Sequence, residues 1–373
     1  MFRHTIPIGR ILGIPIDVDY SWFLIFGLVT WLLAVGYYPA ELKGAPRAEF
    51  WLMGAATALL FFVSIVLHEL AHSAVAIHYK IPVRRITLFI FGGVSQIAED
   101  PTRPSTEFFV AIVGPLASFA LAAIFFLIQP LLTHVAPALA VAKYLAYINL
   151  VLGLFNLIPG FPLDGGRVFR AIVWGWIGDV RRATLIAANV GRFFGFLFIL
   201  VGVWIALKGQ LFNGLWTAFI GWFLESAAAS QVQQQLLNNL LAGHKVSEAI
   251  GNDCLRVPAG APLQDIIDQQ VLRHGRRCFL VQQHDEVLGM LTLHSIKIIP
   301  ETAWPTTTAG EAMIPINKLS TTSPDAELST ALEKMGRDGI NQMPVMQGSD
   351  FVGMLSRDDV VHYLQLLQQL HTR

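Results

Sequence analysis

Long apolar runs, separated by short polar connections, dominate about the first 230 positions of the chain. Six of these runs approach or reach the length needed to cross about 30 Å of hydrocarbon as a helix. The last two are short and only three residues separate them, so the pattern predicts a tight helical hairpin there. The six predicted spans cover residues 21–40, 52–77, 108–132, 138–159, 193–207 and 211–227.

Two shorter segments in the same part of the chain favour strands. Residues 6–18 alternate loosely around two glycines, and residues 84–97 (RRITLFIFGGVSQI) combine β-branched and aromatic residues with a central glycine pair. This composition disfavours a helix and is typical of a small hairpin or a re-entrant sheet. We therefore expect a small β element associated with the membrane-spanning helices.

The pattern becomes polar from about residue 230, where a Gln-rich stretch predicts a linker helix. Two similar segments follow at a spacing of roughly 64 residues: VLGMLT at 287–292 matches FVGMLS at 351–356, and SEAI at 247–250 matches GEAM at 310–313. Such a repeat indicates a duplicated unit of strand, helix, strand, strand and helix. The predicted organisation is a membrane domain over 1–228, a linker helix over 229–244, and two repeats over 245–300 and 301–373.

The composition supports a membrane protein with a soluble part. Hydrophobic residues make up 54% of the 373 residues and charged residues only 14%. The formal net charge is zero and no block of like charges occurs, which argues against a nucleic-acid partner. The two cysteines, Cys254 and Cys278, are too few for a disulfide framework, which favours a reducing compartment such as the cytosol.

The distribution of lysine and arginine predicts the orientation in the membrane. The N-terminal arm and the connections after the second and fourth spans are rich in these residues, whereas the opposite connections offer only Lys43, Arg47 and Lys208. Positively charged loops stay in the cytoplasm, so both termini are expected there, in a multi-pass protein of the plasma membrane. An even number of spans agrees with this orientation.

The second predicted span contains His68-Glu69-Leu70-Ala71-His72. Positions i and i+4 lie on one face of a helix about one turn apart, so both imidazoles can reach one Zn²⁺. Glu69 is then placed to take a proton from the attacking water. Ionisable groups in a lipid-crossing helix are costly and persist mainly with a functional partner, which favours a metal site over a chance match.

Two histidines and a general base leave a metal site one ligand short. Asp164, in NLIPGFPLDGGR at the end of the fourth predicted span, is the strongest candidate. Pro159 and Pro162 break that helix, which is tolerated at membrane depth only where backbone lines a protein cavity. Asp164 can equally be the cap of the helix predicted from Arg167 onward. The predicted orientation brings this aspartate and the histidine motif toward the same membrane face.

HELAH in a membrane helix together with NLIPGFPLDGGR resembles the site-2 protease family of intramembrane metalloproteases, in its six-span branch with C-terminal CBS domains. The resemblance covers nearly the whole chain. It implies a polytopic α-helical membrane protein with a small β element, followed by a soluble α/β tandem CBS domain. It also implies one zinc ion held by His68, His72 and Asp164, with Glu69 as general base and Asn156 binding the substrate backbone or the oxyanion.

The resemblance implies hydrolysis of peptide bonds in or near the transmembrane segment of a single-span membrane protein in the lipid bilayer. A transmembrane helix hides its carbonyls, so the substrate must unwind, and Gly92, Gly93 and Val94 can pair with it as an added strand. A tight turn beside the catalytic helix explains these glycines equally well. Where relatives often have Asn, the third span has Ser118, which leaves the role of that position open.

The repeats resemble a pair of CBS domains, modules that often bind adenine nucleotides such as ATP, ADP or AMP. Ser356 and Asp359 fit the S/T-x-x-D pattern, whose acid binds ribose hydroxyls in relatives, and Thr322 lies on a nearby predicted strand. Ser295 stands where the first repeat needs its acid, so we expect at most one good nucleotide site. Asp359 can instead simply favour the start of the last helix. CBS modules commonly pair through their helices, so the resemblance also implies a homodimer.

The main alternative function is a transporter or channel gated by CBS domains, in which the histidines and Asp164 bind an ion in transit. Transport does not require a glutamate between two histidines at this spacing, so the motif fits hydrolysis better. A protease-like scaffold that binds without cutting is a third alternative. The sequence weakens it, because all four catalytic groups are present.

Overall fold

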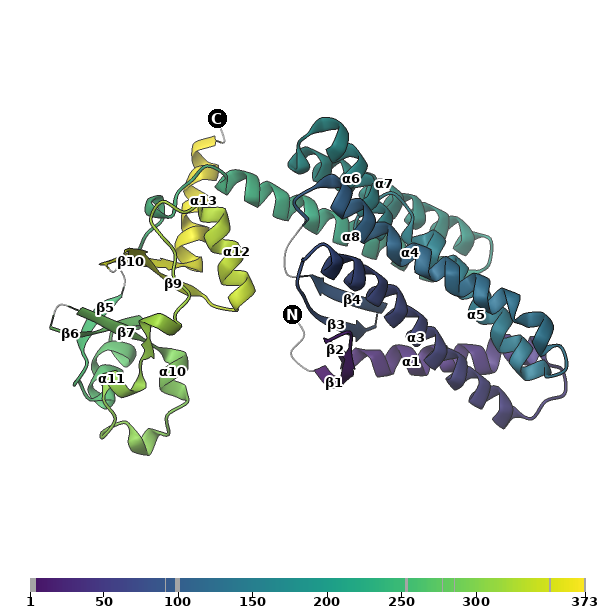
Figure 1. Cartoon of the computed structure of the whole chain (residues 1–373), viewed down its shortest axis with the longest axis horizontal. Coiled ribbons are helices and arrows are strands. Elements are labelled where there is room, and N and C mark those ends of the chain that lie inside the picture. The colour runs from purple at the N-terminus through teal and green to yellow at the C-terminus, as the bar shows by residue number, and fades with distance from the viewer. Residues whose placement is uncertain are drawn as a thin grey trace. The chain divides into compact units, whose positions relative to one another are not determined.

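A computed structural model of the chain describes residues 5–90, 92–97, 101–251, 254–276, 278–284, 286–348 and 350–371. The chain divides into two compact units, Met1–Gln235 and Leu236–Arg373. The first unit is a bundle of apolar helices with a small sheet, and the second is a smaller α/β unit (Figure 1). This architecture confirms the predicted fold class.

Long apolar helices make up most of the first unit. Within the described residues, five are long and apolar enough to cross a membrane: Ser21–Glu41, α3 (Arg47–His78), α4 (Pro104–Leu127), α5 (Ala136–Asn156) and α7 (Val180–Leu207). The first comprises α1 (Ser21–Leu32), one π-helical turn (Leu33–Tyr37) and α2 (Tyr38–Glu41). The sixth predicted span, 211–227, forms the first part of α8 (Leu211–Leu241), which continues without a break into the predicted linker.

The last two spans form the predicted helical hairpin, but the first of them is longer than the apolar run. The α7 helix begins at Val180, because the Asp179 side chain caps it by accepting hydrogen bonds from the N–H groups of Arg181 and Arg182. Glycines let α7 and α8 approach closely: a Cβ added at Gly202 would lie 2.4 Å from the backbone nitrogen of Ala218. Small residues at helix contacts are typical of membrane bundles.

The predicted β element is a four-stranded sheet in the order β1 (Thr5–Ile11), β2 (Ile14–Asp19), β3 (Val83–Phe89) and β4 (Gly92–Ile97). The two hairpins are antiparallel and join through parallel pairing of β2 with β3. Apolar residues of the two central strands, including Val18 and Leu88, pack on α3 residues Phe62 and Ile65. The sheet therefore lies directly beside the helix that carries the HExxH motif (Figure 1).

The proline-containing segment forms a turn between α5 and α6 (Asp164–Ile177), as predicted, and α6 begins at Asp164 rather than at Arg167. Paired glycines bring this turn against the start of α6. A Cβ at Gly165 would lie 2.4 Å from the carbonyl carbon of Leu157, and one at Gly166 would lie 2.3 Å from that of Gly160. The close packing of turn and helix fixes the position of the Asp164 backbone.

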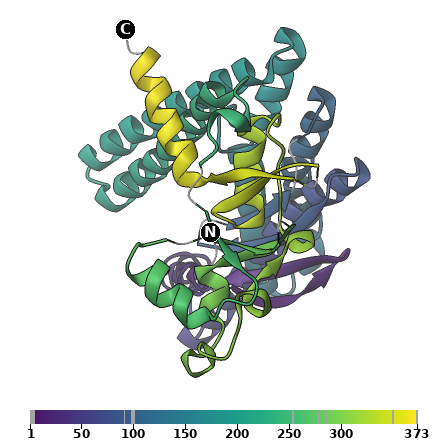
Figure 2. The ribbon, with the colours of Figure 1, turned by 90° about the vertical axis from the view of Figure 1, so that its left-hand side faces the viewer.

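The second unit contains the expected duplicated pattern. Its first half holds β5 (Leu255–Pro258), α9 (Leu263–Ile266), β6 (Cys278–Gln283), β7 (Glu286–Thr292) and α10 (Leu293–Lys297). Its second half holds α11 (Ala309–Ala312), β8 (Ile314–Pro315), α12 (Leu328–Asp338), β9 (Gln342–Gln347), β10 (Asp350–Ser356) and α13 (Arg357–His371). A π-helical turn (Ile267–Leu272) extends α9, and single 3-10 turns lie at Val246–Glu248, Glu301–Ala303 and Ile316–Lys318. Figure 2 shows α13, in yellow, running from the last strand to the C-terminal end.

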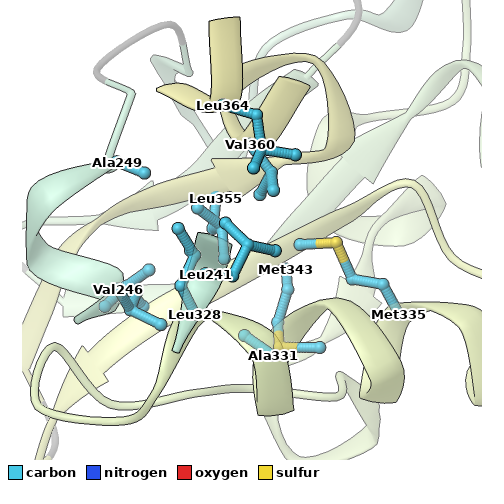
Figure 3. Close-up of a cluster of buried hydrophobic side chains, with 11 residues drawn as sticks. Leu241, Val246, Ala249, Leu328, Ala331, Met335, Met343, Leu355, Val360 and Leu364 are labelled. Atoms are coloured by element: carbon cyan, nitrogen blue, oxygen red, sulfur yellow. The ribbon is translucent and has the colours of Figure 1, made fainter. Parts of the chain in front are cut away.

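The two repeats exchange their leading segments. Val246 and Ala249 pack in the core of the second repeat, with Leu328, Met343 and Leu355 (Figure 3). Correspondingly, Ala309 and Ala312 pack in the core of the first repeat, where β8 pairs with β7 and extends the order β5-β6-β7-β8. Each repeat therefore completes its core with the leading segment of the other repeat.

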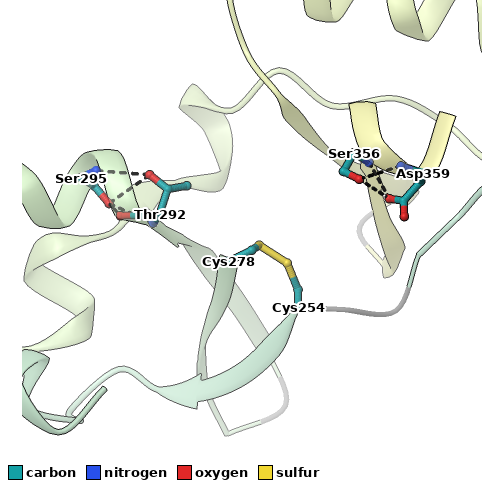
Figure 4. Close-up of a disulfide and its surroundings, with 6 residues drawn as sticks. All are labelled: Cys254, Cys278, Thr292, Ser295, Ser356 and Asp359. Atoms are coloured by element: carbon teal, nitrogen blue, oxygen red, sulfur yellow. Dashed lines mark hydrogen bonds between the residues drawn. A yellow bond between two sulfur atoms is a disulfide. The ribbon is translucent and has the colours of Figure 1, made fainter. Parts of the chain in front are cut away.

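The cysteines contradict the expectation from the sequence. Cys254 and Cys278 form a disulfide across 24 positions (Figure 4). Parallel pairing of β5 with β6, in which Leu255 lies opposite Phe279, places the two cysteines at adjacent strand starts with their Cα atoms 5.2 Å apart. Spacing along the chain does not show this proximity, so the cysteine content no longer supports a reducing compartment.

Candidate active site

The HExxH motif lies in the second half of α3, and its two histidines are almost fully buried, with 4% and 5% of their surface exposed. One helical turn separates them, and their Nε2 atoms lie 3.2 Å apart. The Asp164 Oδ2 atom lies 3.0 Å from Nε2 of His68 and 3.2 Å from Nε2 of His72. The turn after α5 therefore brings the predicted carboxylate to both imidazoles.

This arrangement fits a zinc ion. The metal-binding atoms of His68, His72 and Asp164 lie within 4.8 Å of one another. Tetrahedral zinc with bonds of about 2.0–2.1 Å has neighbouring ligand atoms about 3.3 Å apart, close to the separations found here. Two imidazoles and one carboxylate make a donor set that leaves the fourth position for water or substrate, as in catalytic zinc sites.

Two groups on α4 orient the imidazoles from behind. Nδ1 of His72 lies 2.6 Å from the backbone oxygen of Val110, and Nδ1 of His68 lies 2.9 Å from Oγ of Ser118. The Val110 carbonyl can only accept, so His72 carries a proton on Nδ1, which in the neutral ring leaves the Nε2 lone pair free to bind a metal ion between His72, His68 and Asp164. Donation by His68 to Ser118 gives the same tautomer. Such outer partners fix ring orientation at metal sites.

Ser118, whose role the sequence left open, is fully buried and orients the His68 ring. Gly114, also on α4, faces the imidazoles: a Cβ there would lie 2.1 Å from Nε2 of His72 and 2.7 Å from Nε2 of His68. No other residue type leaves room for both rings at this distance from α4.

The Glu69 carboxylate contacts the sheet through one of its oxygens. Its Oε2 atom accepts hydrogen bonds from the Ser95 backbone N–H at 3.0 Å and from the Ser95 hydroxyl at 2.7 Å. A Cβ at Gly93 would lie 2.7 Å from Cγ of Glu69, so the glycine in β4 makes room for this side chain. The glycine-containing strand therefore positions the predicted general base.

Three further predicted site residues of the first unit, Asn156, Gly92 and Val94, lie on α5 and β4. Asn156 is the last residue of α5, half-buried at the start of the turn that leads to Asp164. Gly92 and Val94 lie on β4, which pairs with β3 and forms the edge of the sheet within the described strands. Val94 is 38% exposed.

In the second unit, Ser356 and Asp359 form the cap of α13. Oδ2 of Asp359 accepts hydrogen bonds from the N–H and hydroxyl of Ser356, at 2.8 and 2.6 Å. Thr322 pairs with Val345 in β9, on the side of that strand away from β10. In the first repeat, Thr292 and Ser295 make the equivalent cap without an acid (Figure 4).

A residue of the first repeat, Gly251, also lies beside the Asp359 carboxylate. A Cβ at Gly251 would lie 2.9 Å from Oδ1 of Asp359. Gly251 also lines a cavity of about 150 Å³ together with Cys254, Arg256, Leu280 and residues 351–354. Typical ligand pockets measure about 300–1,000 Å³, so this cavity must widen to admit a nucleotide.

Sequence reasoning missed Ser95, Val110 and Gly251 as members of these sites. Val110 acts through its backbone, which carries no residue signal, and Gly251 lies far from Asp359 in sequence. Ser95 directly follows Gly92-Gly93-Val94, the residues predicted to pair with the substrate, so the sequence shows where Ser95 lies but not that it binds Glu69.

Comparison with known proteins identifies both units. The model of peptidase family M50 matches residues 56–136 and 132–202, and the CBS domain model matches residues 309–366. Rip3 of Mycobacterium tuberculosis is 35% identical over 98% of this chain and 94% of its own length. The protein sll0528 of Synechocystis is 34% identical over 97% and 96%. Both are named as zinc metalloproteases.

Among solved structures, a site-2 protease from Methanocaldococcus jannaschii matches with a TM-score of 0.43 and 29% identity, over 61% of this chain and 95% of that one. The matches to the relatives named as zinc metalloproteases extend over almost the entire sequence, and the family M50 model covers the positions of His68, His72 and Asp164. The chain therefore belongs to peptidase family M50, the site-2 protease family, and is an intramembrane zinc metalloprotease that carries a CBS domain.

Proposed function

We propose that His68, His72 and Asp164 hold the catalytic zinc ion and that Glu69 is the general base. The observation that carries this assignment is the convergence of Nε2, Nε2 and Oδ2 at separations of 3.0–3.2 Å from three buried or half-buried side chains. Glu69 follows a ligand directly in sequence, and Ser95 fixes its carboxylate.

In peptide hydrolysis each group of the chain has a defined task. Zinc, when bound, supplies Lewis-acid activation of the water and of the scissile carbonyl. Glu69 accepts a proton from the attacking water and passes it to the leaving amine. The two hydrogen bonds from Ser95 hold Oε2, so the carboxylate does not have to reorganise during the proton transfer. The amide of Asn156 binds the substrate backbone or the developing oxyanion.

We further propose that the substrate is a single-span membrane protein, which enters as an extended segment along β4. Gly92, Gly93 and Val94 lie at the edge of the described sheet, and their strand leads to the residue that holds Glu69. An added strand would expose its peptide carbonyls beside the catalytic groups. The backbone N–H of Ser95 already donates a hydrogen bond to Glu69. The substrate strand would therefore pair with the residues of β4 that precede Ser95.

The orientation in the plasma membrane, with both termini cytoplasmic, rests on the distribution of arginine. The described helices support it in one respect: Arg181 and Arg182 stand in the first turn of α7, where they flank a span rather than interrupt it. In this orientation the CBS repeats lie in the cytoplasm, the compartment that supplies adenine nucleotides, and their Cys254–Cys278 disulfide is then a cytoplasmic one.

We propose that the repeats regulate proteolysis by binding an adenine nucleotide near Thr322, Ser356 and Asp359, and that they pair into a homodimer. Arg256 in the adjacent cavity adds a cation suited to phosphate, and Asp359 is the acid suited to ribose hydroxyls. One oxygen of Asp359 accepts the hydrogen bonds that cap α13. A bound nucleotide would therefore share this carboxylate with Ser356 or displace those hydrogen bonds. Titration of AMP and ATP into wild-type protein and the Asp359→Ala variant tests this assignment; equal affinities would contradict it.

Replacement of Glu69 by Gln tests the catalytic assignment. A general base contributes about 10²–10⁴-fold, so Glu69→Gln should reduce cleavage of a transmembrane peptide by at least about 100-fold while zinc content stays at the wild-type level. Glu49→Gln, near the start of the same helix, is the matched control and should cleave normally. Cleavage by Glu69→Gln at the wild-type rate would remove Glu69 from the mechanism.

A further inference from the structure

A buried ion pair joins the helices α4 and α6. Glu107, in the first turn of α4, has none of its surface exposed. Its Oε1 atom accepts hydrogen bonds from Nε of Arg170, at 2.7 Å, and from Nη2 of the same guanidinium. Nε of Arg167 lies 3.9 Å from the same oxygen. Both arginines belong to α6, the helix that begins at Asp164.

The Arg170 guanidinium connects three further parts of the fold. It lies over the ring of Phe161, 5.2 Å from the ring centre, and Phe161 belongs to the turn between α5 and α6. Its Nη1 atom reaches the Thr184 hydroxyl on α7 at 3.5 Å. One cation thus fixes α6 to α4, to α7 and to the turn that delivers the metal-binding carboxylate.

Glu107 shares its face of α4 with the groups that orient the histidines. Glu107, Val110, Gly114 and Ser118 follow one another at intervals of three, four and four residues, which places them on one side of a helix. Val110 and Ser118 orient the two imidazoles by hydrogen bonds, and Gly114 lets both rings lie close to α4. Glu107 binds α6 through its ion pair. A single helix face therefore determines where the histidines and Asp164 meet.

We infer that Glu107 and Arg170 form a positioning pair that sets the approach of Asp164 to the two histidines. The inference rests on the proposed metal site. Arg170 lies six residues after Asp164 on a rigid helix, about 9 Å along its axis, so displacement of one end moves the other. The pair touches neither the histidines nor Glu69 in any interaction described above, and its effect passes through α6.

Metal binding by variants tests this inference in the full-length protein. In Arg170→Gln the zinc affinity should fall by about tenfold, which is the lower end of the effect of removing support around a metal ligand. The visible absorption of the Co²⁺-loaded variant should shift toward that of Asp164→Ala, because both variants lose carboxylate ligation. Arg170→Lys keeps the charge but not the two-point contact, and should show intermediate values.

The matched control is Arg192→Gln. Arg192 pairs with Glu225 at 3.1 Å and joins α7 to α8, so it is also an ion pair between spans but does not involve α4 or α6. Its zinc affinity and Co²⁺ spectrum should equal those of the wild type. Should Arg170→Gln fail to fold, the same comparison is made with Arg170→Lys.

An unchanged affinity and spectrum in the Arg170 variants would overturn the inference. So would a lower affinity with an unchanged spectrum, because the pair would then support the fold in general rather than the Asp164 ligand. A wild-type protein that takes up neither Zn²⁺ nor Co²⁺ would instead overturn the proposed metal site itself, so the two failures are distinguishable.

Discussion

Gly114 determines how closely α4 approaches the catalytic imidazoles. A methyl group there would overlap Nε2 and Cε1 of His72, at 2.1 and 2.5 Å, and both atoms belong to a ring that Val110 holds in place. Neither α4 nor the ring can move without breaking that hydrogen bond. The absence of a side chain at this position is therefore part of the metal site.

Gly114→Ala should lower zinc affinity by at least about tenfold, a loss typical of disturbed support around a metal ligand. Gly175→Ala is the control, since a Cβ at Gly175 on α6 meets only Pro104, at an ordinary 3.8 Å. Competition with a chelator measures both affinities. Wild-type affinity in Gly114→Ala would show that the rings do not occupy the positions described.

Glu248 illustrates how exposed groups stabilise the second unit. It accepts hydrogen bonds from the backbone N–H of Lys245, from the Tyr363 hydroxyl and from Nδ1 of His244. These bonds, with the backbone bond first, lower the pKa of the Glu248 carboxyl from 4.5 to about 2. The interaction ties the leading segment of the first repeat to α13.

The sign of this shift predicts the pH dependence of stability. A carboxyl with a lowered pKa in the folded state contributes fully above its unfolded value and loses that contribution as pH falls toward the folded value. The unfolding temperature of the wild type should therefore decline between about pH 4.5 and pH 2, and Glu248→Gln should decline less across this window. Calorimetry of both proteins checks this; identical pH profiles would contradict it.

At the residue scale, the sequence predicted those groups whose chemistry is visible in a local motif. The i, i+4 spacing of His68 and His72 needs only a helix, and Asp164 followed from the missing ligand. Ser118, Ser95 and Val110 act across distances of 50, 26 and 38 positions in the chain. No local pattern encodes such contacts, because they depend on how α3, α4 and β4 pack.

At the scale of elements, the small sheet has a structural and a catalytic role. Its buried residues cover one side of α3, while its edge strand holds Glu69 through Ser95. The strand pattern was predictable from alternation and glycines. The parallel joining of the two hairpins was not, because 63 or more positions separate β2 from β3 and pairing at such distance has no local signal.

The disulfide is a second contact between elements, joining β5 to β6. Closing a loop of this length stabilises a folded unit by about 2–4 kcal/mol. Cys254→Ser should lower the free energy of unfolding of the second unit by that amount, as measured by denaturant titration. A reductant added to the wild type should reproduce the effect and should leave Cys254→Ser unchanged; no response in either case would contradict a stabilising disulfide.

For the whole molecule, the composition changes near residue 230 and the two units meet between Gln235 and Leu236, within α8. The domain boundaries after residues 228, 244 and 300 stay a prediction. The apolar runs predicted the helices because hydropathy and length are local properties. The apolar runs did not predict the beginning of a helix where polar residues belong to it, as in the first turns of α7. The exchange of leading segments between the repeats was also not predictable, since each core draws on residues from both halves.

The proposed metal site exists only if the turn after α5 brings Asp164 to the histidines of α3. Metal analysis of purified wild-type protein beside Asp164→Ala tests it most directly, with cleavage of a model transmembrane peptide measured on both. We predict one zinc ion per chain and cleavage in the wild type, with loss of stoichiometric zinc and of cleavage in the variant. Equal zinc content and equal cleavage in the two proteins would contradict the claim.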